Sequence, residues 1–257
     1  TISAGRVFEM MDRDDYEPKQ AGSLKEIERG DIRFEHVSFS YDGKRDVLKE
    51  ISFEVKNGQT IAFVGHTGSG KSSIINLFMR FYEFDRGQIL IDGQDIKDYS
   101  QEALRKSIGL VLQEPFLYHG TIASNIRMYH EELTDEDVRQ AAAFVDVADF
   151  IESLPGGYAH PVTERGSTLS TGQRQLLAFA RTIAAQPKIL ILDEATANID
   201  QETEEMIQNS LKKMRQGRTT IAIAHRLSTI QDADCIYVLD KGKIIESGNH
   251  DQLIALG

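Results

Sequence analysis

Apolar and polar residues alternate along the first part of the chain, which is typical of strands that bury one face. Arg33–Ser40 and Ile51–Val55 show this alternation, and Asn57-Gly58 indicates a turn. Ile61–Val64 is instead a short apolar run that leads into a glycine-rich loop. Because Ser72–Phe81 then has apolar residues at helical spacing, the pattern predicts strands, a buried strand, a loop and a helix.

Strand signals fade between residues 101 and 166, apart from the apolar run Ile108–Leu112. Thr134, with Asp137 three residues later, predicts the capped start of a helix. Ala141–Ile151 has helical spacing as well. We therefore expect these residues to form an inserted helical subdomain.

Strand and helix patterns alternate again in the last third of the chain. We expect helices at Ser170–Ala185 and Glu202–Met214, and a last helix capped by Asn249. Apolar runs predict strands at Ile189–Leu192, Thr219–Ala224, Cys235–Leu239 and Lys243–Glu246. Buried strands that alternate with helices predict an α/β fold with a mostly parallel sheet covered on both faces.

Composition and charge exclude several classes of protein. The 257 residues are 40% hydrophobic and 27% charged, which are ordinary globular values and exclude a disordered or fibrous chain. The net charge is −11 and basic runs are absent from the sequence, so nucleic acid is not an expected partner. A single cysteine, Cys235, allows no internal disulfide. The sequence has neither a signal pattern nor a membrane-length apolar stretch. Because the chain begins at Thr1 and not at Met, we expect a part of a longer protein.

The strongest chemical motif is the run Gly65-His66-Thr67-Gly68-Ser69-Gly70-Lys71-Ser72, which matches the phosphate-binding loop G-x-x-x-x-G-K-[ST]. An apolar strand precedes it and a helix follows, so backbone N–H groups and the helix N-terminus would surround a phosphate. Lys71 is expected to reach the β- and γ-phosphates and Ser72 to ligate Mg²⁺, with Ser73 also at the nucleotide. The alternative is a glycine-rich turn that matches the pattern by chance.

A second acidic site follows the apolar strand Ile189–Leu192. Ligands of parallel sheets bind outside the carboxyl ends of the strands, so Asp193 is expected near the phosphate loop, where it would hold Mg²⁺. Glu194 is the expected general base that activates the attacking water. The alternative is a solvated acidic turn after a core strand.

The sequence Leu169-Ser170-Thr171-Gly172-Gln173 resembles the signature of ATP-binding cassette (ABC) proteins. The resemblance extends over residues 31–257 and is greatest to the nucleotide-binding domains of multidrug-type exporters. It implies a P-loop NTPase (RecA-like) core at 31–100 and 167–257 with an antiparallel β subdomain, and a helical subdomain at 101–166. Residues 1–30 would then be the connector from the last transmembrane helix.

The resemblance also implies roles for single residues. Tyr41 resembles the aromatic residue that stacks on adenine, although an ordinary strand aromatic is the alternative. Gln113 resembles the glutamine that contacts Mg²⁺ and the attacking water, and a polar strand cap is its alternative. His225 resembles the histidine that donates to the γ-phosphate, against the alternative of a structural histidine.

In this family two domains pair head to tail around two ATP molecules, so some residues act on the nucleotide of the partner. Ser170, Gly172 and Gln173 would cap that nucleotide with a helix N-terminus. Asp200 resembles an aspartate that communicates across the same interface. Glu164 and Arg165 resemble the segment that contacts the membrane domains, with a solvated charge pair as the alternative.

Two departures from the family pattern concern the partner. Thr171 stands where the signature usually has glycine, and Ala197-Asn198-Ile199-Asp200 replaces the usual Ser-Ala-Leu-Asp. A branched side chain adds bulk where backbone approaches the nucleotide. The hypothesis is one half of a heterodimeric exporter, and the alternative is a homodimer that tolerates threonine.

The sequence thus predicts an ATP- and Mg²⁺-dependent ATPase on the cytoplasmic face of the cell membrane. It would power export of a drug, lipid or peptide, with a transmembrane domain of the same full-length chain and a second half-transporter as partners. Three alternatives belong to other classes: a soluble ABC ATPase of DNA repair or translation, a nucleotide-sensing module and a small-molecule kinase. The acidic charge disfavours the soluble ABC ATPase. Glu194 and His225 disfavour the nucleotide-sensing module, and the signature disfavours the kinase.

Overall fold

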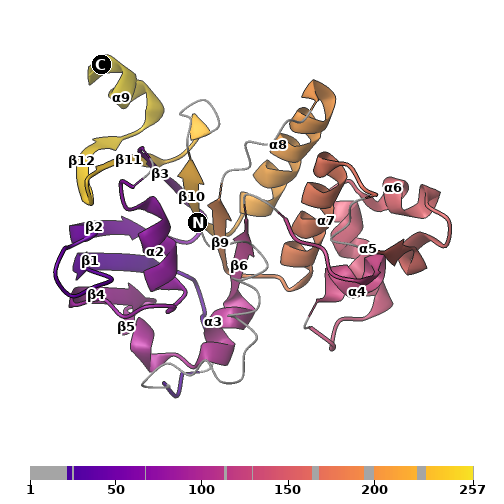
Figure 1. The fold of residues 1–257 in the computed structure, drawn as a ribbon, viewed down its shortest axis with the longest axis horizontal. Helices are drawn as coiled ribbons and strands as arrows, with labels where there is room; N and C mark the ends of the chain where they lie inside the picture. The colour runs from indigo at the N-terminus through magenta and orange to yellow at the C-terminus, as the bar shows by residue number, and fades with distance from the viewer. Residues whose placement is uncertain are drawn as a thin grey trace. The chain divides into compact units, whose positions relative to one another are not determined.

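The computed structural model describes residues 22–24, 26–66, 68–112, 115–128, 130–163, 168–193, 200–224 and 230–256. The chain forms two compact units (Figure 1). Among the described residues, the sheet unit combines those up to 108 with 188–194 and 217–257, and the helical unit combines 109–187 with 195–216. The helical subdomain at 101–166 and the other domain boundaries stay predictions.

The sheet unit contains the predicted antiparallel strands in the order β2-β1-β4-β5. These are β1 (Ile32–Phe39), β2 (Leu48–Val55), β4 (Arg86–Ile91) and β5 (Gln94–Asp95). Their buried face is apolar, and the rings of Phe34 and Phe53 stack at 4.4 Å across β1 and β2. Asp92 and Gly93 turn the chain between β4 and β5 with φ of 52° and 76°, as an Asp-Gly hairpin turn requires.

The larger sheet of this unit confirms the predicted parallel arrangement. Its strands follow the order β12-β11-β3-β10-β9, and only β12 runs antiparallel to its neighbour. Every residue of β3 and β10 is buried, as expected for strands covered on both faces. The bounds are β3 (Thr60–Val64), β9 (Ile189–Asp193), β10 (Thr219–Ala224), β11 (Cys235–Asp240) and β12 (Lys243–Gly248).

Helices connect these strands. The helices of the sheet unit are α2 (Lys71–Phe78), the 3₁₀ turn η1 (Ile96–Asp98), α3 (Gln101–Ser107) and α9 (His250–Leu256). The predicted cap of the last helix is confirmed, because Asn249 Oδ1 accepts from Gln252 N at 2.9 Å. Strand β6 (Ile108–Val111) carries the chain from the sheet unit into the helical unit.

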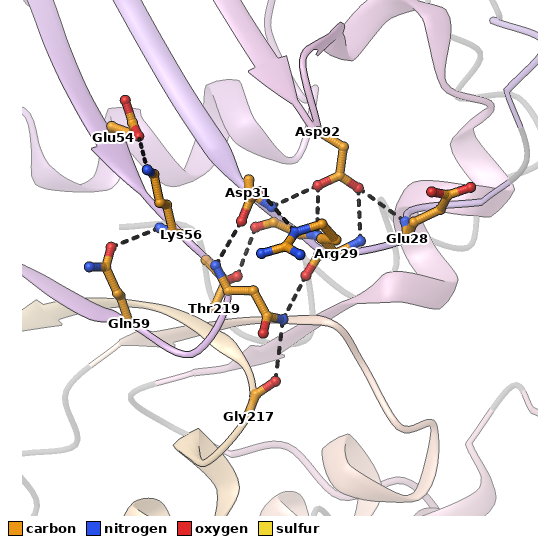
Figure 2. A network of polar contacts seen from close by, with 11 residues as sticks. Glu28, Arg29, Asp31, Glu54, Lys56, Gln59, Asp92, Gly217 and Thr219 are labelled. Atoms are coloured by element: carbon orange, nitrogen blue, oxygen red, sulfur yellow. Dashed lines mark hydrogen bonds and ion pairs between the residues drawn. The ribbon is translucent and has the colours of Figure 1, made fainter.

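The segment before β1 is attached to the antiparallel sheet by one carboxylate (Figure 2). Asp92 Oδ2 accepts hydrogen bonds from Glu28 N and Arg29 N, both at 3.0 Å. Asp92 Oδ1 accepts from Gly30 N and Asp31 N, both at 2.9 Å. Four successive backbone donors are thus satisfied by a residue more than sixty positions away in sequence.

A second set of contacts joins the same segment to the larger sheet (Figure 2). The Asn57 side chain donates to Arg29 O at 2.8 Å and to Gly217 O at 3.4 Å. Thr219 at the start of β10 donates its hydroxyl proton to Gly30 O at 2.8 Å. The segment therefore bridges both sheets of the unit before β1 begins.

The helical unit is built around α7 (Thr171–Ala184), most of whose residues are buried. Buried Arg181 on this helix donates to Asn125 O at 2.9 Å and Phe116 O at 2.8 Å, which ties α7 to the chain around α4. The other elements are β7 (Gly120–Thr121), α4 (Ile122–Arg127), α5 (Asp135–Phe144), α6 (Ala148–Ser153), η2 (Gly157–Ala159), β8 (Pro161–Val162) and α8 (Gln201–Arg215). Thr134 caps α5 through the predicted reciprocal bonds with Asp137.

The predicted helix Ala141–Ile151 is wrong, because α5 ends at Phe144 and α6 begins at Ala148. Between them Asp146 has a left-handed φ of 62°. The Ser210 hydroxyl on α8 donates to Val145 O at 3.0 Å. At the break, this backbone carbonyl is therefore hydrogen-bonded to a side chain of another helix. None of the helices in the described ranges has the length and apolarity needed to cross a membrane.

Candidate functional site

The predicted phosphate loop lies between β3 and α2 in the sheet unit. β3 ends at Val64, and α2 begins at Lys71 with Gly70 at its N-cap position. Gly70 contributes no side-chain cap, and the first turn of α2 carries no acidic residue. The N-terminus of α2 therefore directs backbone N–H groups and the positive end of the helix dipole at the loop, which favours an anion.

Two glycines of the loop are required by geometry. Gly70 has φ of +109°, and a Cβ there would lie 2.8 Å from Leu48 Cδ2. A Cβ on Gly65 would lie 2.5 Å from Leu239 O and 2.7 Å from Ser69 Oγ. The loop is thus closely packed at Gly65 and Gly70, and a side chain at either position would collide with its neighbours. Thr67 of the motif lies outside the described residues.

Two polar side chains of the loop are buried in a way that fits a phosphate ligand. Lys71 is 5% exposed, and its Nζ donates to Gly65 O in its own loop. Ser69 is 4% exposed, and its Oγ has no hydrogen-bond partner among the described residues. A buried hydroxyl without a partner is costly, and a phosphate oxygen would satisfy it. The residues present therefore fit a bound polyphosphate.

Asp193 lies at the same edge of the sheet as this loop. It is the last residue of β9 and is half-buried. In the sheet register Asp193 pairs with Ile223 of β10, and Ile223 pairs with Phe63 of β3. Since neighbouring strands are about 4.8 Å apart, the backbone of Asp193 lies about 10 Å from that of Phe63, which is two residues before the loop begins at Gly65. A carboxylate at this position can assist a cation held by the phosphates.

Tyr41 follows β1, and its side chain reaches α2. Its hydroxyl shares a hydrogen bond with Ser73 Oγ at 3.0 Å and accepts one from Asn76 Nδ2 at 2.9 Å. The residue is still 48% exposed, so part of the ring is accessible to a flat ligand. Sequence reasoning missed Asn76; its signal was a polar residue three positions after Ser73, hence on the same face of the helix.

The signature residues form the N-terminus of α7 in the helical unit. Ser170 Oγ accepts from Gln173 N at 3.1 Å, and Ser170 N donates to Gln173 Oε1 at 2.9 Å. This capping box confirms the predicted helix start. Gly172 is buried, and the Thr171 hydroxyl accepts from Arg174 Nη2 at 3.3 Å on its own helix.

Asp200 caps α8 in the helical unit. Its Oδ2 accepts from Thr203 N at 3.0 Å. Hydrogen bonds from the Thr203 hydroxyl and the Thr203 N–H lower the pKa of the exposed Asp200 carboxyl. The carboxylate therefore starts a helix, whatever further contact it makes.

Several predicted residues lie outside the described part of the chain, namely Gln113, Glu164, Arg165, Glu194 and His225, so the structure gives no position for them. Ser72 is the second residue of α2, and His66 lies in the loop, where its carbonyl oxygen accepts from Ser69 N at 3.0 Å. The described residues contain no group of three or more His, Cys, Asp and Glu side chains that could hold a metal ion.

Comparisons with known proteins agree with this geometry. Residues 48–197 match the family model of the ABC transporter. The chain is 71% identical over 256 residues to a putative ABC transporter ATP-binding protein, exp8, of Streptococcus pneumoniae, and covers 44% of that protein. It is 52% identical to YheH of Bacillus subtilis, a probable multidrug resistance ABC transporter ATP-binding/permease protein, over 99% of this chain and 38% of that one.

A solved structure adds the fold. The chain matches the structure of a bacterial Atm1-family ABC exporter with ATP bound at a TM-score of 0.84 and 43% identity, over 93% of this chain and 42% of that one. The chain therefore spans less than half the length of these relatives. These matches agree with the phosphate loop, with the aspartate at the end of β9 and with the signature at the start of α7. The chain therefore belongs to the ABC transporter family, as an ATP-binding ATPase domain with a P-loop NTPase core.

Proposed function

We propose that this chain hydrolyses ATP to power export through the membrane part of a longer protein. The observation that carries the proposal is the loop at the carboxyl edge of the parallel sheet. Three groups lie together in this loop: the N-terminus of α2, the buried Lys71 side chain, and the Ser69 hydroxyl, which has no hydrogen-bond partner in the described part of the chain. Asp193 lies at the same edge of the sheet. This is a polyphosphate site with a carboxylate within reach of a bound cation.

A few residues would bind the nucleotide and its cation. Backbone N–H groups of residues 65–73 bind the β-phosphate. When the nucleotide binds, Lys71 Nζ donates to phosphate oxygens instead of to Gly65 O. Tyr41 stacks on adenine. Mg²⁺ bound to the phosphates would be held by Ser72, Gln113 and Asp193, and it would neutralise charge on the transferring phosphoryl group.

The hydrolysis step needs a base and a donor. Glu194 accepts a proton from water while the water oxygen forms a bond to the γ-phosphorus and the bond to the β-γ bridging oxygen breaks. The products are ADP and inorganic phosphate. Gln113 orients the same water, and His225 donates to a γ-phosphate oxygen. The roles of Gln113 and His225 rest on the family resemblance, and that of Glu194 rests on its position after β9.

A second domain completes each site. Ser170, Gly172 and Gln173 at the N-terminus of α7 cap the nucleotide on a partner domain, and Asp200 contacts that partner. Support comes from α7 itself, whose first turn holds no acidic residue and so favours an anion. The relatives named as ATP-binding/permease proteins support a membrane domain in the same longer chain. Residues 1–30 would be the connector to it, and this domain would lie on the cytoplasmic face.

The partner is proposed to be a different half-transporter, because Thr171 replaces glycine in the signature. The Thr171 hydroxyl bonds its own helix at 3.3 Å, so the methyl group adds bulk at the capping surface. ATPase activity should be higher when the protein is produced with its neighbouring half-transporter than alone. Robust transport by a homodimer would contradict this part of the proposal.

The central experiment is Glu194→Gln in the intact protein. Removing the base should lower kcat by at least about a hundredfold and leave ATP affinity within a few-fold of wild type, so that the closed dimer accumulates. Glu205→Gln on the exposed face of α8 is the matched control and should retain full turnover. Near-normal turnover of Glu194→Gln would show that another group is the base.

A further inference from the structure

The Tyr41 ring is held by two other aromatic rings. Phe39 lies edge-on to it at 4.6 Å with an interplanar angle of 76°, and Tyr82 lies edge-on at 4.9 Å and 90°. Phe39 and Tyr82 also contact each other at 5.8 Å. The three rings form a closed cluster in which each restricts the others, and such pairs favour defined orientations.

The other end of the Tyr41 side chain is held by α2. Its hydroxyl bonds both Ser73 Oγ and Asn76 Nδ2, at 3.0 Å and 2.9 Å. Asn76 contributes a second contact, because its backbone carbonyl accepts from Phe81 N at 2.9 Å in the turn that leads to Tyr82. One residue therefore holds the hydroxyl of Tyr41 and the backbone that carries the neighbouring ring.

These contacts have a consequence for nucleotide binding, given the proposed role of Tyr41 at adenine. A ring that must be immobilised on binding loses side-chain entropy, which opposes binding. A ring already fixed at both ends avoids this cost. Since α2 also provides the phosphate site at its N-terminus, Asn76 sets the position of the stacking ring relative to the phosphates.

We propose that Asn76 is a positioning residue for the nucleotide base, acting through the Tyr41 hydroxyl. It makes no contact with the phosphates in this role. Its loss should therefore weaken binding of ATP and leave the chemical step unchanged. The inference rests on the proposed function, because it presumes that Tyr41 stacks on adenine.

A double-mutant cycle in the intact protein tests the inference. Asn76→Ala and Tyr41→Phe should each raise KM for ATP about fivefold, with kcat within about twofold of wild type. The double variant should raise KM no more than the larger single change, because both remove the same hydrogen bond. Inhibition by Mg²⁺–tripolyphosphate, which lacks the base, should be the same in Asn76→Ala and wild type.

Two controls separate positioning from general damage to α2. Ile75→Ala, on the same half-buried turn, should leave KM for ATP unchanged, and Asn76→Gln, which keeps an amide donor, should recover part of the affinity. Equal increases of KM in Ile75→Ala and Asn76→Ala, or weaker tripolyphosphate inhibition in Asn76→Ala, would overturn the inference. Additive effects in the double variant would overturn it as well.

Tyr41→Ala distinguishes failure of this inference from failure of the proposed function. If Tyr41→Ala raises KM and Asn76→Ala does not, adenine stacking stands and the positioning role of Asn76 is wrong. If Tyr41→Ala leaves KM unchanged, the base binds elsewhere, and both the adenine contact and the role of Asn76 are overturned.

Discussion

The substitution Asp92→Asn removes one acceptor oxygen from the carboxylate that holds the segment before β1 (Figure 2). The substitution is nearly isosteric, and asparagine tolerates the left-handed φ of 52° at this turn as well as aspartate does. The backbone conformation should therefore remain, and only the hydrogen bonds should change. That makes the variant a clean test of the contacts with the four N–H groups of residues 28–31.

The magnitude follows from the number of bonds lost. The NH₂ group of the new amide would face two N–H donors, so two of the four bonds at 2.9–3.0 Å disappear. Each net loss is about 1 kcal/mol, and the remaining two bonds lose the extra strength of a charged acceptor. The free energy of unfolding should fall by about 2–3 kcal/mol. Asp92→Gly, which tolerates the same φ and removes all four bonds, should cost about 4 kcal/mol.

Chemical denaturation measures the global effect, and amide hydrogen exchange measures the local one. A loss of about 2 kcal/mol in local stability should speed exchange at residues 28–31 about thirtyfold. Asp46→Asn is the matched control, since its exposed ion pair with Arg86 at 3.1 Å should contribute less than about 1 kcal/mol. Unchanged stability and exchange in Asp92→Asn would show that water replaces the carboxylate at no cost, which would refute the reasoning.

Two further predictions concern charge. Lys71→Ala should weaken ATP binding at least about tenfold, because the cation that faces the phosphates is lost, whereas Lys56→Ala, an exposed residue paired with Glu54 at 3.6 Å, should bind normally in a labelled-nucleotide titration. Burial, followed by the charge of Asp92, raises the pKa of Tyr99 to about 12, above the value of about 10 expected in the unfolded chain. Between about pH 10 and 12 the unfolded chain loses this proton first, so the free energy of unfolding should fall with rising pH, by at most about 1.4 kcal/mol per pH unit. Denaturation curves of Tyr99→Phe at several pH values should show a smaller dependence of the free energy of unfolding on pH.

Local patterns in the sequence predicted the features that depend on local physics. The capping boxes at Thr134 and Ser170 lie where the spacing of their partners indicated, because each is completed within one turn of helix. The buried strand before the glycine-rich loop was equally readable, since a parallel strand covered on both faces is apolar throughout. The strand, loop and helix of the proposed phosphate site were therefore predictable from residues that lie next to each other.

Contacts between distant segments were not predictable in the same way. The break between α5 and α6 depends on the Ser210 hydroxyl at Val145 O and on Lys213, whose Nζ lies 2.8 Å from Asp146 Oδ2. Helical spacing continues across this break, so periodicity alone merged the two helices. The Asp92-Gly93 pair is a local turn signal, but the Asp92 carboxylate accepts hydrogen bonds from a segment 61–64 residues earlier, which no local pattern indicates.

The same distinction applies to the phosphate loop, whose shape depends on a residue outside the motif. Gly242, in the turn between β11 and β12, donates its N–H to Ser69 O at 2.9 Å, and its carbonyl accepts from Lys49 N at 2.8 Å. A Cβ at Gly242 would lie 2.1 Å from Val47 O, so only glycine allows this approach. The β2 strand and the β11–β12 turn thus fix the loop before a nucleotide arrives. Because the loop is already ordered, phosphate binding does not lose entropy in ordering it. A substitution at Gly242 should therefore weaken ATP binding, although residue 242 does not contact the nucleotide.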